Sequence, residues 1–271
     1  MSNIRKNIKK FVIFLAIALS SFFVASSEDN MLEVSFFDVG QGDSSFIRAN
    51  GTDILIDGGP DNTLLSRLGE TLLYSDRSID IIIISHFHDD HVTGLGELLN
   101  RYQVSNLIYL KDSKTNHALE YILERVNDEN INIIALDGEK TINLGDDCYM
   151  KLLDPRILGI KEDDNNSIVS RLDCRGESFL FSGDNERVVE KALLQYDWGI
   201  EADTFKASHH GSRTSNSEAF LKKVNPKKVI ISSGEGNKFN HPSEEVIERL
   251  NSLEIEIYRT DMQGSIRLRE H

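Results

Sequence analysis

The sequence predicts an α/β protein in which two sheets pack together between outer helices, within one domain. Short apolar runs bounded by turn residues alternate with segments of helical spacing along most of the 271 residues. This alternation occurs in two successive halves, and no low-complexity linker separates them. The hydrophobic content of 39% and the aromatic content of 8% are ordinary for a globular protein. We therefore expect a single domain over residues 28–271.

The first 27 residues depart from this pattern. A basic stretch precedes an apolar run of 15 residues at positions 11–25, which is the layout of a secretory signal peptide. A membrane helix needs about 20 apolar residues. The run can be lengthened towards this by counting Ile8 and tolerating Ser20 and Ser21, so an N-terminal membrane anchor stays open as a second interpretation. A buried N-terminal helix is disfavoured because the run is apolar on all sides. Both interpretations of residues 1–27 predict an extracytoplasmic domain, either secreted or anchored to the membrane by the N-terminal apolar segment.

In the first half, the strands are predicted from turn-bounded apolar runs and the helices from their spacing. Residues 79–85 form a β-branched run without alternation, as expected of a strand covered on both faces. The predicted strands are Leu32–Val39, Ser45–Ala49, Asp53–Ile56, Ile79–Ser85, Leu107–Leu110 and Ile131–Leu136. The predicted helices are Leu64–Leu73, Gly94–Tyr102 and Ala118–Asn127.

The second half repeats the same kinds of signal. Two of its strands form a hairpin through the turn Cys174–Glu177. The predicted strands are Cys148–Leu153, Ser167–Asp173, Ser178–Ser182, Thr204–Ala207, Lys228–Ser232, Glu254–Arg259 and Ser265–Arg269. The predicted helices are Glu186–Gln195, Ser217–Lys223 and Pro242–Leu250. We find no internal repeat in the sequence itself.

The chain is acidic, with a formal net charge of −14. Such a surface has no general attraction for nucleic acid, whose binding rests on Lys and Arg neutralising phosphates. A nucleic-acid substrate would need a local basic patch. The lysines at 222, 223, 227 and 228 are one candidate, although such a run is usually a solvated face.

Two cysteines, Cys148 and Cys174, are spaced compatibly with neighbouring strands. They are predicted either to form one disulfide or to remain two buried thiols. Their spacing does not resemble that of a Cys-rich zinc site.

The segment from Ser85 to His91 carries the strongest chemical signal, with three histidines and two aspartates in six positions after an apolar strand. In an extended segment His86 and His88 point to the same side, so their rings can share a metal ion. Asp90 and His91 follow in the turn and can supply a second metal nearby. A surface polar loop explains this concentration of ligand side chains poorly.

The pattern His-x-His-x-Asp-His resembles the metallo-β-lactamase superfamily. The resemblance extends to Ser182-Gly183-Asp184, which looks like the bridging aspartate of that superfamily, and to a later histidine at position 209 or 210. It implies a four-layer αββα sandwich with the site at one edge. It also implies that His86 and His88 bind one metal, that Asp90 and His91 bind the other, and that Asp184 contacts both.

A narrower resemblance covers residues 32–269. It is to the hydrolase domain of ComEC-type DNA-uptake competence proteins and to related phosphorylcholine esterases. Each shared segment is weak alone, but the combination is specific. The segments are Phe37–Asp43, Leu55–Gly59, Asp164–Val169, Ser182–Asp184, His209–Ser212 and Asn240–Pro242.

The narrower group has Asn165-Asn166-Ser167 where many superfamily members place a histidine on the first metal. The resemblance therefore implies a first site that is poorer in protein ligands. Asn166, water or a substrate phosphate are the candidates for the open position, although Asn in a loop is more often a turn former.

Adjacent side chains in an extended segment point in opposite directions, so His209 and His210 are not expected to reach the same metal. We expect His209 to be the metal ligand and His210 to contact the substrate or assist catalysis. Asp57 is expected either to orient a ligand histidine or only to form its turn. Asp43 is expected to be structural through hydrogen bonds to adjacent loops. His241 is expected to donate a proton to the leaving group or contact a phosphate, or else to be a surface residue.

Together these residues predict a hydrolase with two divalent metal ions, in which a metal-bound hydroxide attacks and Asp184, His210 and His241 assist. Zinc is the default because imidazoles dominate the ligand set, and manganese is the alternative. The substrate predicted from the resemblance is a phosphodiester, in DNA or in the cell envelope. With at most one short apolar segment, the chain is not expected to import DNA by itself. No stable protein partner is implied.

The alternatives are a β-lactamase or thioester hydrolase of the same fold, and a non-catalytic metal-binding protein. The segment Ser85–His91 and Asp184 count against loss of the metals, and Asn165-Asn166 is the feature that favours it.

Overall fold

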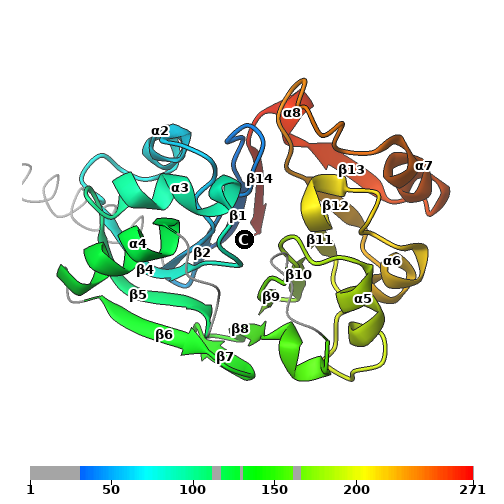
Figure 1. Cartoon of the computed structure of the whole chain (residues 1–271), viewed down its shortest axis with the longest axis horizontal. Coiled ribbons are helices and arrows are strands. Elements are labelled where there is room, and N and C mark those ends of the chain that lie inside the picture. Colours follow the sequence, from blue (N-terminus) through cyan, green and yellow to red (C-terminus); the bar gives the residue numbers. More distant parts are fainter. Residues whose placement is uncertain (1–30, 112–116, 129–130, 161–165, 271) are drawn as a thin grey trace, which may run out of the picture.

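The computed structural model describes residues 31–111, 117–128, 131–160 and 166–270, which form two mixed sheets of seven strands each. The spatial order of the first sheet is β14-β1-β2-β3-β4-β5-β6 (Figure 1). Its strands are β1 (Leu32–Phe36), β2 (Ser45–Ala49), β3 (Thr52–Ile56), β4 (Ser78–Ile83), β5 (Gln103–Leu110), β6 (Asn132–Leu136) and β14 (Ile266–Glu270). The helices that connect its parallel strands are α2 (Thr63–Thr71), α3 (Asp89–Leu98) and α4 (His117–Asp128).

The spatial order of the second sheet is β13-β12-β11-β10-β9-β8-β7. Its strands are β7 (Glu139–Asn143), β8 (Cys148–Leu153), β9 (Val169–Cys174), β10 (Glu177–Phe181), β11 (Thr204–Lys206), β12 (Lys228–Ile231) and β13 (Glu256–Arg259). Its connecting helices are α5 (Arg187–Leu193), α6 (Glu218–Val224) and α7 (Glu244–Ser252). The short elements are η1 (Pro155–Leu158), η2 (Ser208–Gly211) and α8 (Thr260–Gln263).

The two sheets follow one plan. From β14 to β3 neighbouring strands are antiparallel, and from β3 to β6 they are parallel. From β7 to β10 neighbouring strands are likewise antiparallel, and from β10 to β13 they are parallel. A helix connects each parallel pair, because a parallel crossover must return the chain to the opposite end of the sheet. The topology is therefore repeated although the sequence shows no repeat.

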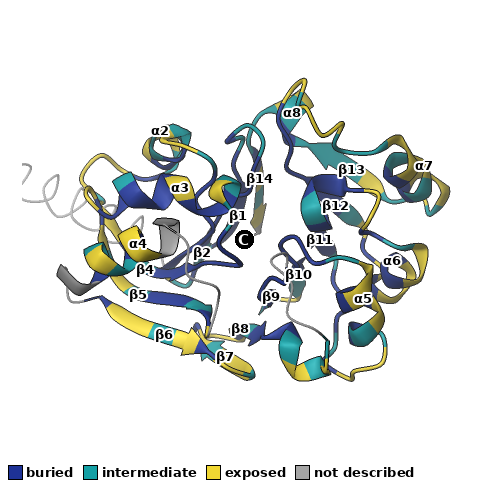
Figure 2. Ribbon diagram, in the orientation of Figure 1, coloured by how far each residue is buried: buried dark blue, intermediate teal, exposed yellow. Residues whose placement is uncertain are grey.

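Three apolar layers hold the sheets and helices together. Residues from both sheets form the central layer, and each outer face packs against its own helices. Ile81 and Ile83 of β4 enter the central layer, whereas Ile82 and Ile84 pack under the helices. Each such buried side chain contributes about 1.5–3 kcal/mol. Figures 1 and 2 show α2, α3 and α4 on one side and α5, α6 and α7 on the other. The predicted single-domain αββα fold is confirmed.

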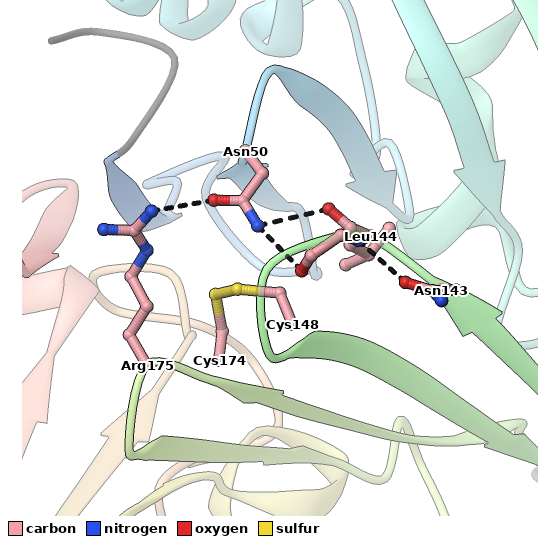
Figure 3. The surroundings of a disulfide bond; sticks show 7 residues. Asn50, Asn143, Leu144, Cys148, Cys174 and Arg175 are labelled. Carbon is pink, nitrogen blue, oxygen red and sulfur yellow. Dashed lines mark hydrogen bonds between the residues drawn. A yellow bond between two sulfur atoms is a disulfide. The ribbon is translucent and has the colours of Figure 1, made fainter.

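Cys148 and Cys174 face each other on β8 and β9 and form a disulfide (Figure 3). Beside it, the side chain of Asn50 joins the two halves of the molecule. Its amide nitrogen donates to the carbonyl oxygens of Leu144 and Gly145 (3.2 and 2.9 Å), and its oxygen accepts from Arg175 Nη2 (2.9 Å). Of the two predicted states of the cysteines, the structure has the bonded one.

Most predicted elements are present. Two differ from the prediction, namely the start of α3 near the site and strand β7 at the edge of the second sheet. Helix α3 begins at Asp89 instead of Gly94, because the residue before it, His88, is extended and two acidic residues stabilise the first turn. Strand β7 was not predicted. It is an exposed edge strand of mostly polar residues, so it lacks the apolar pattern by which strands are found.

The predicted localisation needs a correction. Within the described ranges no helix is long and apolar enough to cross a membrane, and α4, the longest, has 12 residues against the roughly 20 required. This finding contradicts the part of the predicted localisation that has the domain held at a membrane by an apolar anchor. The predicted signal or anchor itself, residues 1–27, lies outside the described residues, as does Asn165.

Candidate metal centre

The histidine cluster lies where β4 leaves the first sheet. After Ile84 the chain turns away, and His88 is the last extended residue before α3. Asp90 and His91 consequently lie in the first turn of this helix. A carboxylate is favoured there by the positive end of the helix dipole.

One glycine brings this helix against the neighbouring loops. A Cβ atom at Gly42, in the loop between β1 and β2, would overlap the carbonyl oxygen of Asp90. The amide of Asp43 donates to the same carbonyl (3.1 Å), and the amide of Gly58 donates to the carbonyl of His91 (2.6 Å). A side chain at position 42 would force the metal-ligand turn away from the sheet edge.

Asp184 comes from the second half, three residues after β10. Gly183 before it has φ +50°, and a Cβ there would meet the side chain of Ser167 at 2.5 Å. Ser167 Oγ accepts from the amide of Asp184 (3.0 Å). The backbone of Asp184 is thus fixed by the loop that precedes β9.

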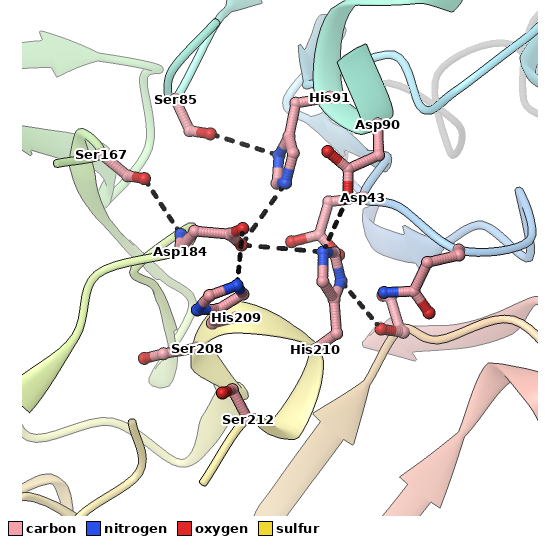
Figure 4. Close-up of polar contacts among 12 residues, drawn as sticks. Asp43, Ser85, Asp90, His91, Ser167, Asp184, Ser208, His209, His210 and Ser212 are labelled. Atoms are coloured by element: carbon pink, nitrogen blue, oxygen red, sulfur yellow. Dashed lines mark hydrogen bonds and ion pairs between the residues drawn. The ribbon is translucent and has the colours of Figure 1, made fainter. Parts of the chain in front are cut away.

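The carboxylate of Asp184 lies among four histidines, of which Figure 4 shows His91, His209 and His210. Its Oδ1 atom is 3.4 Å from His91 Nε2 and 3.8 Å from His210 Nε2. Its Oδ2 atom is 3.8 Å from His86 Nε2 and 3.6 Å from His209 Nε2. The two oxygens therefore face different pairs of imidazoles.

The ring of His91 is oriented from behind by Asp57. Asp57 Oδ2 lies 2.8 Å from His91 Nδ1, so the other ring nitrogen is turned towards Asp184. Asp57 is itself held by Ser85, whose amide and hydroxyl donate to the two carboxylate oxygens (2.8 and 2.6 Å). Of the two interpretations of Asp57, orientation of a ligand histidine is the one that these contacts favour.

The ring of His210 is oriented in a similar way by Asp43. His210 Nδ1 lies 3.2 Å from Asp43 Oδ1 and 3.1 Å from the carbonyl oxygen of Ser232. Its Nε2 atom lies 3.3 Å from Asp90 Oδ2. Asp43 therefore does more than join adjacent loops, because it fixes a ring that faces the metal centre.

His86 is oriented by hydroxyl groups. Its Nδ1 atom lies 3.1 Å from Ser85 Oγ and 3.2 Å from Ser167 Oγ, one from each half of the molecule. Its ring lies next to that of His88, with 4.5 Å between the centroids. This adjacency is what the spacing of two residues predicts.

The donor atoms of this centre fit a metal ion. The Nε2 atoms of His86, His91 and His210 and the Oδ1 atom of Asp184 are buried, and none has a hydrogen-bond partner. Buried polar atoms are nearly always hydrogen-bonded, so converging buried donors without such partners fit the binding of a cation. Among the described residues, four groups of three side chains have donor atoms within 4.8 Å of one another. Two of them are His86-His91-Asp184 and Asp90-His91-His210, and the other two include Asp43.

The charges of the centre agree with this assignment. Burial lowers the pKa of each ring, but Asp184 and Asp57 raise the pKa of His91 well above its usual value. In the same way Asp43 and Asp184 raise the pKa of His210 to about 9 against the effect of burial. Without metal these two rings hold protons between the carboxylates, at the positions where a cation would bind.

The sequence favoured His209 over His210 as the metal ligand, on the assumption of an extended segment. The segment is instead a left-handed turn, with φ +50° at His209 and +53° at His210. Both rings can therefore face the centre, and their centroids are 6.1 Å apart. In the described residues His210 is the one that groups with Asp90 and His91.

His88 and His241 lie at the periphery of the centre. His88 touches His86 but belongs to none of these donor groups. The ring of His241 is half-buried. It lies edge to face with the ring of His209, with 5.6 Å between centroids, and is stacked on that of His210 at 6.3 Å. Asn166 is buried in the loop before β9, next to Ser167.

Sequence reasoning missed Lys206 and the serines that orient the rings. Lys206 lies in β11 and is buried, with 3% of its surface exposed, and its ammonium group contacts Asp43. The available signal was a single lysine inside the short apolar strand that leads to His209. Serines carry no such signal, because their role depends on contacts between distant loops.

Comparison with known proteins gives a consistent result. A family model described as the metallo-beta-lactamase superfamily matches residues 37–235. The chain is 29% identical over 255 residues to ComE operon protein 3 of Bacillus subtilis, covering 88% of this chain and 33% of that protein. The chain thus spans about a third of the length of this relative. The predicted resemblance to competence proteins of the ComEC type is confirmed.

Solved structures share the fold at low sequence identity. The metallo-beta-lactamase fold protein YhfI of Bacillus subtilis aligns with a TM-score of 0.59 and 10% identity, covering 88% of this chain and all of that chain. Human tRNase Z, short form, aligns with a TM-score of 0.57 and 15% identity, covering 86% and 98% of the two chains.

Proposed function

The chain belongs to the metallo-beta-lactamase superfamily, and we propose that it is a two-metal phosphodiesterase. The observation that carries this proposal is the carboxylate of Asp184, whose two oxygens face different pairs of histidines. One carboxylate shared between two sets of imidazoles suits two neighbouring divalent cations.

We assign the second cation to Asp90, His91 and His210, whose donor atoms lie within 4.8 Å of one another. We assign the first cation to His86 and His88, and we add His209 from the opposite half. His209 approaches the same oxygen of Asp184 as His86 does. It would supply the imidazole that the loop before β9 lacks.

Two bound divalent cations would polarise a phosphoryl oxygen and lower the pKa of water. The chain itself orients and holds the participants. Asp184 is fixed through Ser167, and His91 is fixed through Asp57 and Ser85. Zinc suits this set of imidazoles, and manganese suits its carboxylates.

We assign His241 to binding the substrate instead of delivering a proton as an imidazolium ion. Burial and the nearby charge of His210 lower the pKa of His241 to about 4. The ring is therefore neutral near pH 7 and offers one N–H group to a phosphoryl or leaving-group oxygen. Its position beside His209 and His210 suits that contact.

A phosphodiester substrate is supported by relatives and by the surface next to His241. The solved neighbours include a tRNase, and the relative from Bacillus subtilis is named after the ComE operon. On this surface, Phe239 is 53% exposed and stacks on His241 at 5.8 Å, and Lys238 Nζ lies 5.0 Å from the ring of Phe239. A cation and an open aromatic face suit a phosphate that carries a flat group, as in single-stranded nucleic acid.

The test is a parallel assay of three substrates with zinc or manganese: single-stranded DNA, bis-p-nitrophenyl phosphate and p-nitrophenyl phosphorylcholine. We expect metal-dependent cleavage of at least one phosphodiester, abolished by His91→Ala and unchanged by Lys140→Met, a control at an exposed lysine of the edge strand β7. Cleavage that survives His91→Ala would refute the site. Activity on phosphorylcholine alone would restrict the proposal to a cell-envelope phosphodiesterase.

The same preparation tests the alternatives. Turnover of nitrocefin or glutathione thioesters without phosphodiester cleavage would indicate a β-lactamase or a thioester hydrolase. Less than one bound metal equivalent per chain, together with no turnover, would indicate a non-catalytic protein.

A further inference from the structure

Lys206 is an unexpected residue for the interior of this fold. In the described ranges it is the one lysine or arginine whose side chain is buried. Removing an ammonium group from water is very unfavourable unless the charge is paired and hydrogen-bonded. The position of Lys206, at the end of β11 beneath the left-handed turn, therefore needs an explanation in terms of its partners.

Its main partner is Asp43. Lys206 Nζ donates to Asp43 Oδ2 (2.8 Å) and to the carbonyl oxygen of Ala207 (3.1 Å). The other oxygen of the same carboxylate, Asp43 Oδ1, is the atom that lies 3.2 Å from His210 Nδ1. Lys206, Asp43 and His210 thus form a line that ends at the metal centre.

A second carboxylate lies near this line. One oxygen each of Asp43 and Asp57 and a ring nitrogen of His91 all lie within 4.8 Å of one another. Both carboxylates, with Ser85 and Lys206, line a buried cavity of about 10 Å³, the size of one water molecule. Two buried like charges at this separation repel each other, and Lys206 is the lysine that lies beside them.

The two orienting carboxylates are held by different means. Asp57 is fixed by the neutral donors of Ser85, whereas Asp43 is fixed by the charge of Lys206. Loss of the lysine would therefore free Asp43 to turn away from His210 or to take up a proton. It would leave the contact between Asp57 and His91 in place.

We propose that Lys206 is a positioning residue that fixes Asp43 and, through it, directs His210 Nε2 to the second cation. The inference rests on the ligand assignment of the proposed function but not on its substrate. Residues behind metal ligands typically change metal affinity by about 10- to 100-fold when they are replaced. Lys206 should do so for one of the two cations only.

The experiment is a titration of the metal-free full chain with Zn²⁺, followed by isothermal calorimetry, for Lys206→Met and the wild type. We expect one class of sites to bind about 10- to 100-fold more weakly and the other class to be unchanged. Lys222→Met, which removes an exposed lysine, should match the wild type. A purely structural role for Lys206 would lower the thermal stability of the metal-free chain and leave both affinities unchanged, which would overturn the proposal.

A double-mutant cycle with Asp43→Asn tests the route of the effect. If Lys206 acts through Asp43, Lys206→Met should change the affinity by less than about twofold in the Asp43→Asn background. Effects that multiply in the double variant would overturn the proposed line of contacts. The double variant leaves neither buried charge without its partner. It can therefore replace Lys206→Met in the titration if that single variant does not fold. In that case, wild-type affinity in Asp43→Asn would equally refute the proposal.

Zinc affinity is read without any substrate. A chain that binds two cations as expected but cleaves no phosphodiester would refute the proposed function and leave the role of Lys206 standing.

Discussion

The two halves of this molecule share a topology but differ in how they position the candidate metal ligands. In the first half, β4 is followed by Ile84, Ser85 and His86. In the second half, the corresponding strand β11 is followed by Ala207, Ser208 and His209. An apolar residue, a serine and a histidine thus occupy the same three positions after matching strands.

Beyond that histidine the two loops diverge. The first continues into a helix that carries Asp90 and His91, whereas the second closes in a left-handed turn that carries His210. The shared carboxylate, Asp184, comes only from the second half. The difference shows that the same strand topology can carry two different sets of candidate ligand side chains. It also shows that these side chains come together only where the two halves meet.

The largest effect is expected from Asp184→Asn, which keeps the shape of the side chain and removes the charge shared by both halves. Both cations should be lost, and kcat/KM for bis-p-nitrophenyl phosphate should fall by at least about 100-fold, since even residues behind metal ligands reach that range. Metal analysis of the purified variant checks the first point and steady-state kinetics the second. Two retained cations with nearly normal turnover would mean that Asp184 does not join the halves.

The adjacent histidines allow the two donor sets to be separated. His210→Ala should remove about one metal equivalent from the second site, and His209→Ala about one from the first, because their rings face different oxygens of Asp184. Metal analysis of the single variants and of the double variant measures this directly. If His209→Ala keeps both cations, the first site is built from the first half alone.

A smaller effect is expected from Asp57→Asn, which weakens the carboxylate contact with His91. Metal affinity should fall by about 10- to 100-fold. The matched control is Asp53→Asn, which removes another buried carboxylate of the same region that pairs with Arg48 (2.6 Å). Calorimetry should show an unchanged metal affinity in this control, and a drop as large as that of Asp57→Asn would remove the argument for orientation.

The last prediction concerns the dependence of metal affinity on pH. Against the effect of burial, Asp43 and Asp184 raise the pKa of His210 to about 9, so at pH 7 the metal-free ring holds a proton that the cation must displace. The contribution of His210 should therefore be a rise in affinity at the second site of up to about tenfold per pH unit from pH 7 to pH 9, which then levels off. Zinc titrations in two buffers of different ionisation enthalpy measure the released proton. An affinity independent of pH would show that His210 is already neutral.

The sequence predicted the local geometry of the first-half histidines better than that of the second-half histidines, for a physical reason. Residues from His86 to His91 are contiguous, so their spacing alone constrains their geometry. His209 and His210 depend on a left-handed turn that histidines adopt only when the surrounding structure imposes it, and the extended geometry assumed for them was wrong.

Most strands and helices of the fold were also predictable, because apolar runs and helical spacing report directly on which residues are buried. Strand β7 was missed because its residues are mostly polar and exposed, so it carries no apolar pattern. Lys206 and Ser167 act through partners far away in the sequence, Asp43 and His86, and no local pattern encodes such contacts.

Strand β14 pairs with β1 along its whole length, from Leu32 opposite Glu270 to Phe36 opposite Ile266. The first sheet is therefore completed by a strand that follows every strand of the second sheet in the chain. During synthesis on the ribosome, β1 keeps an open edge until the second half has emerged. Contacts this distant in sequence form late and slowly, so the two halves should gain stability together as one cooperative unit.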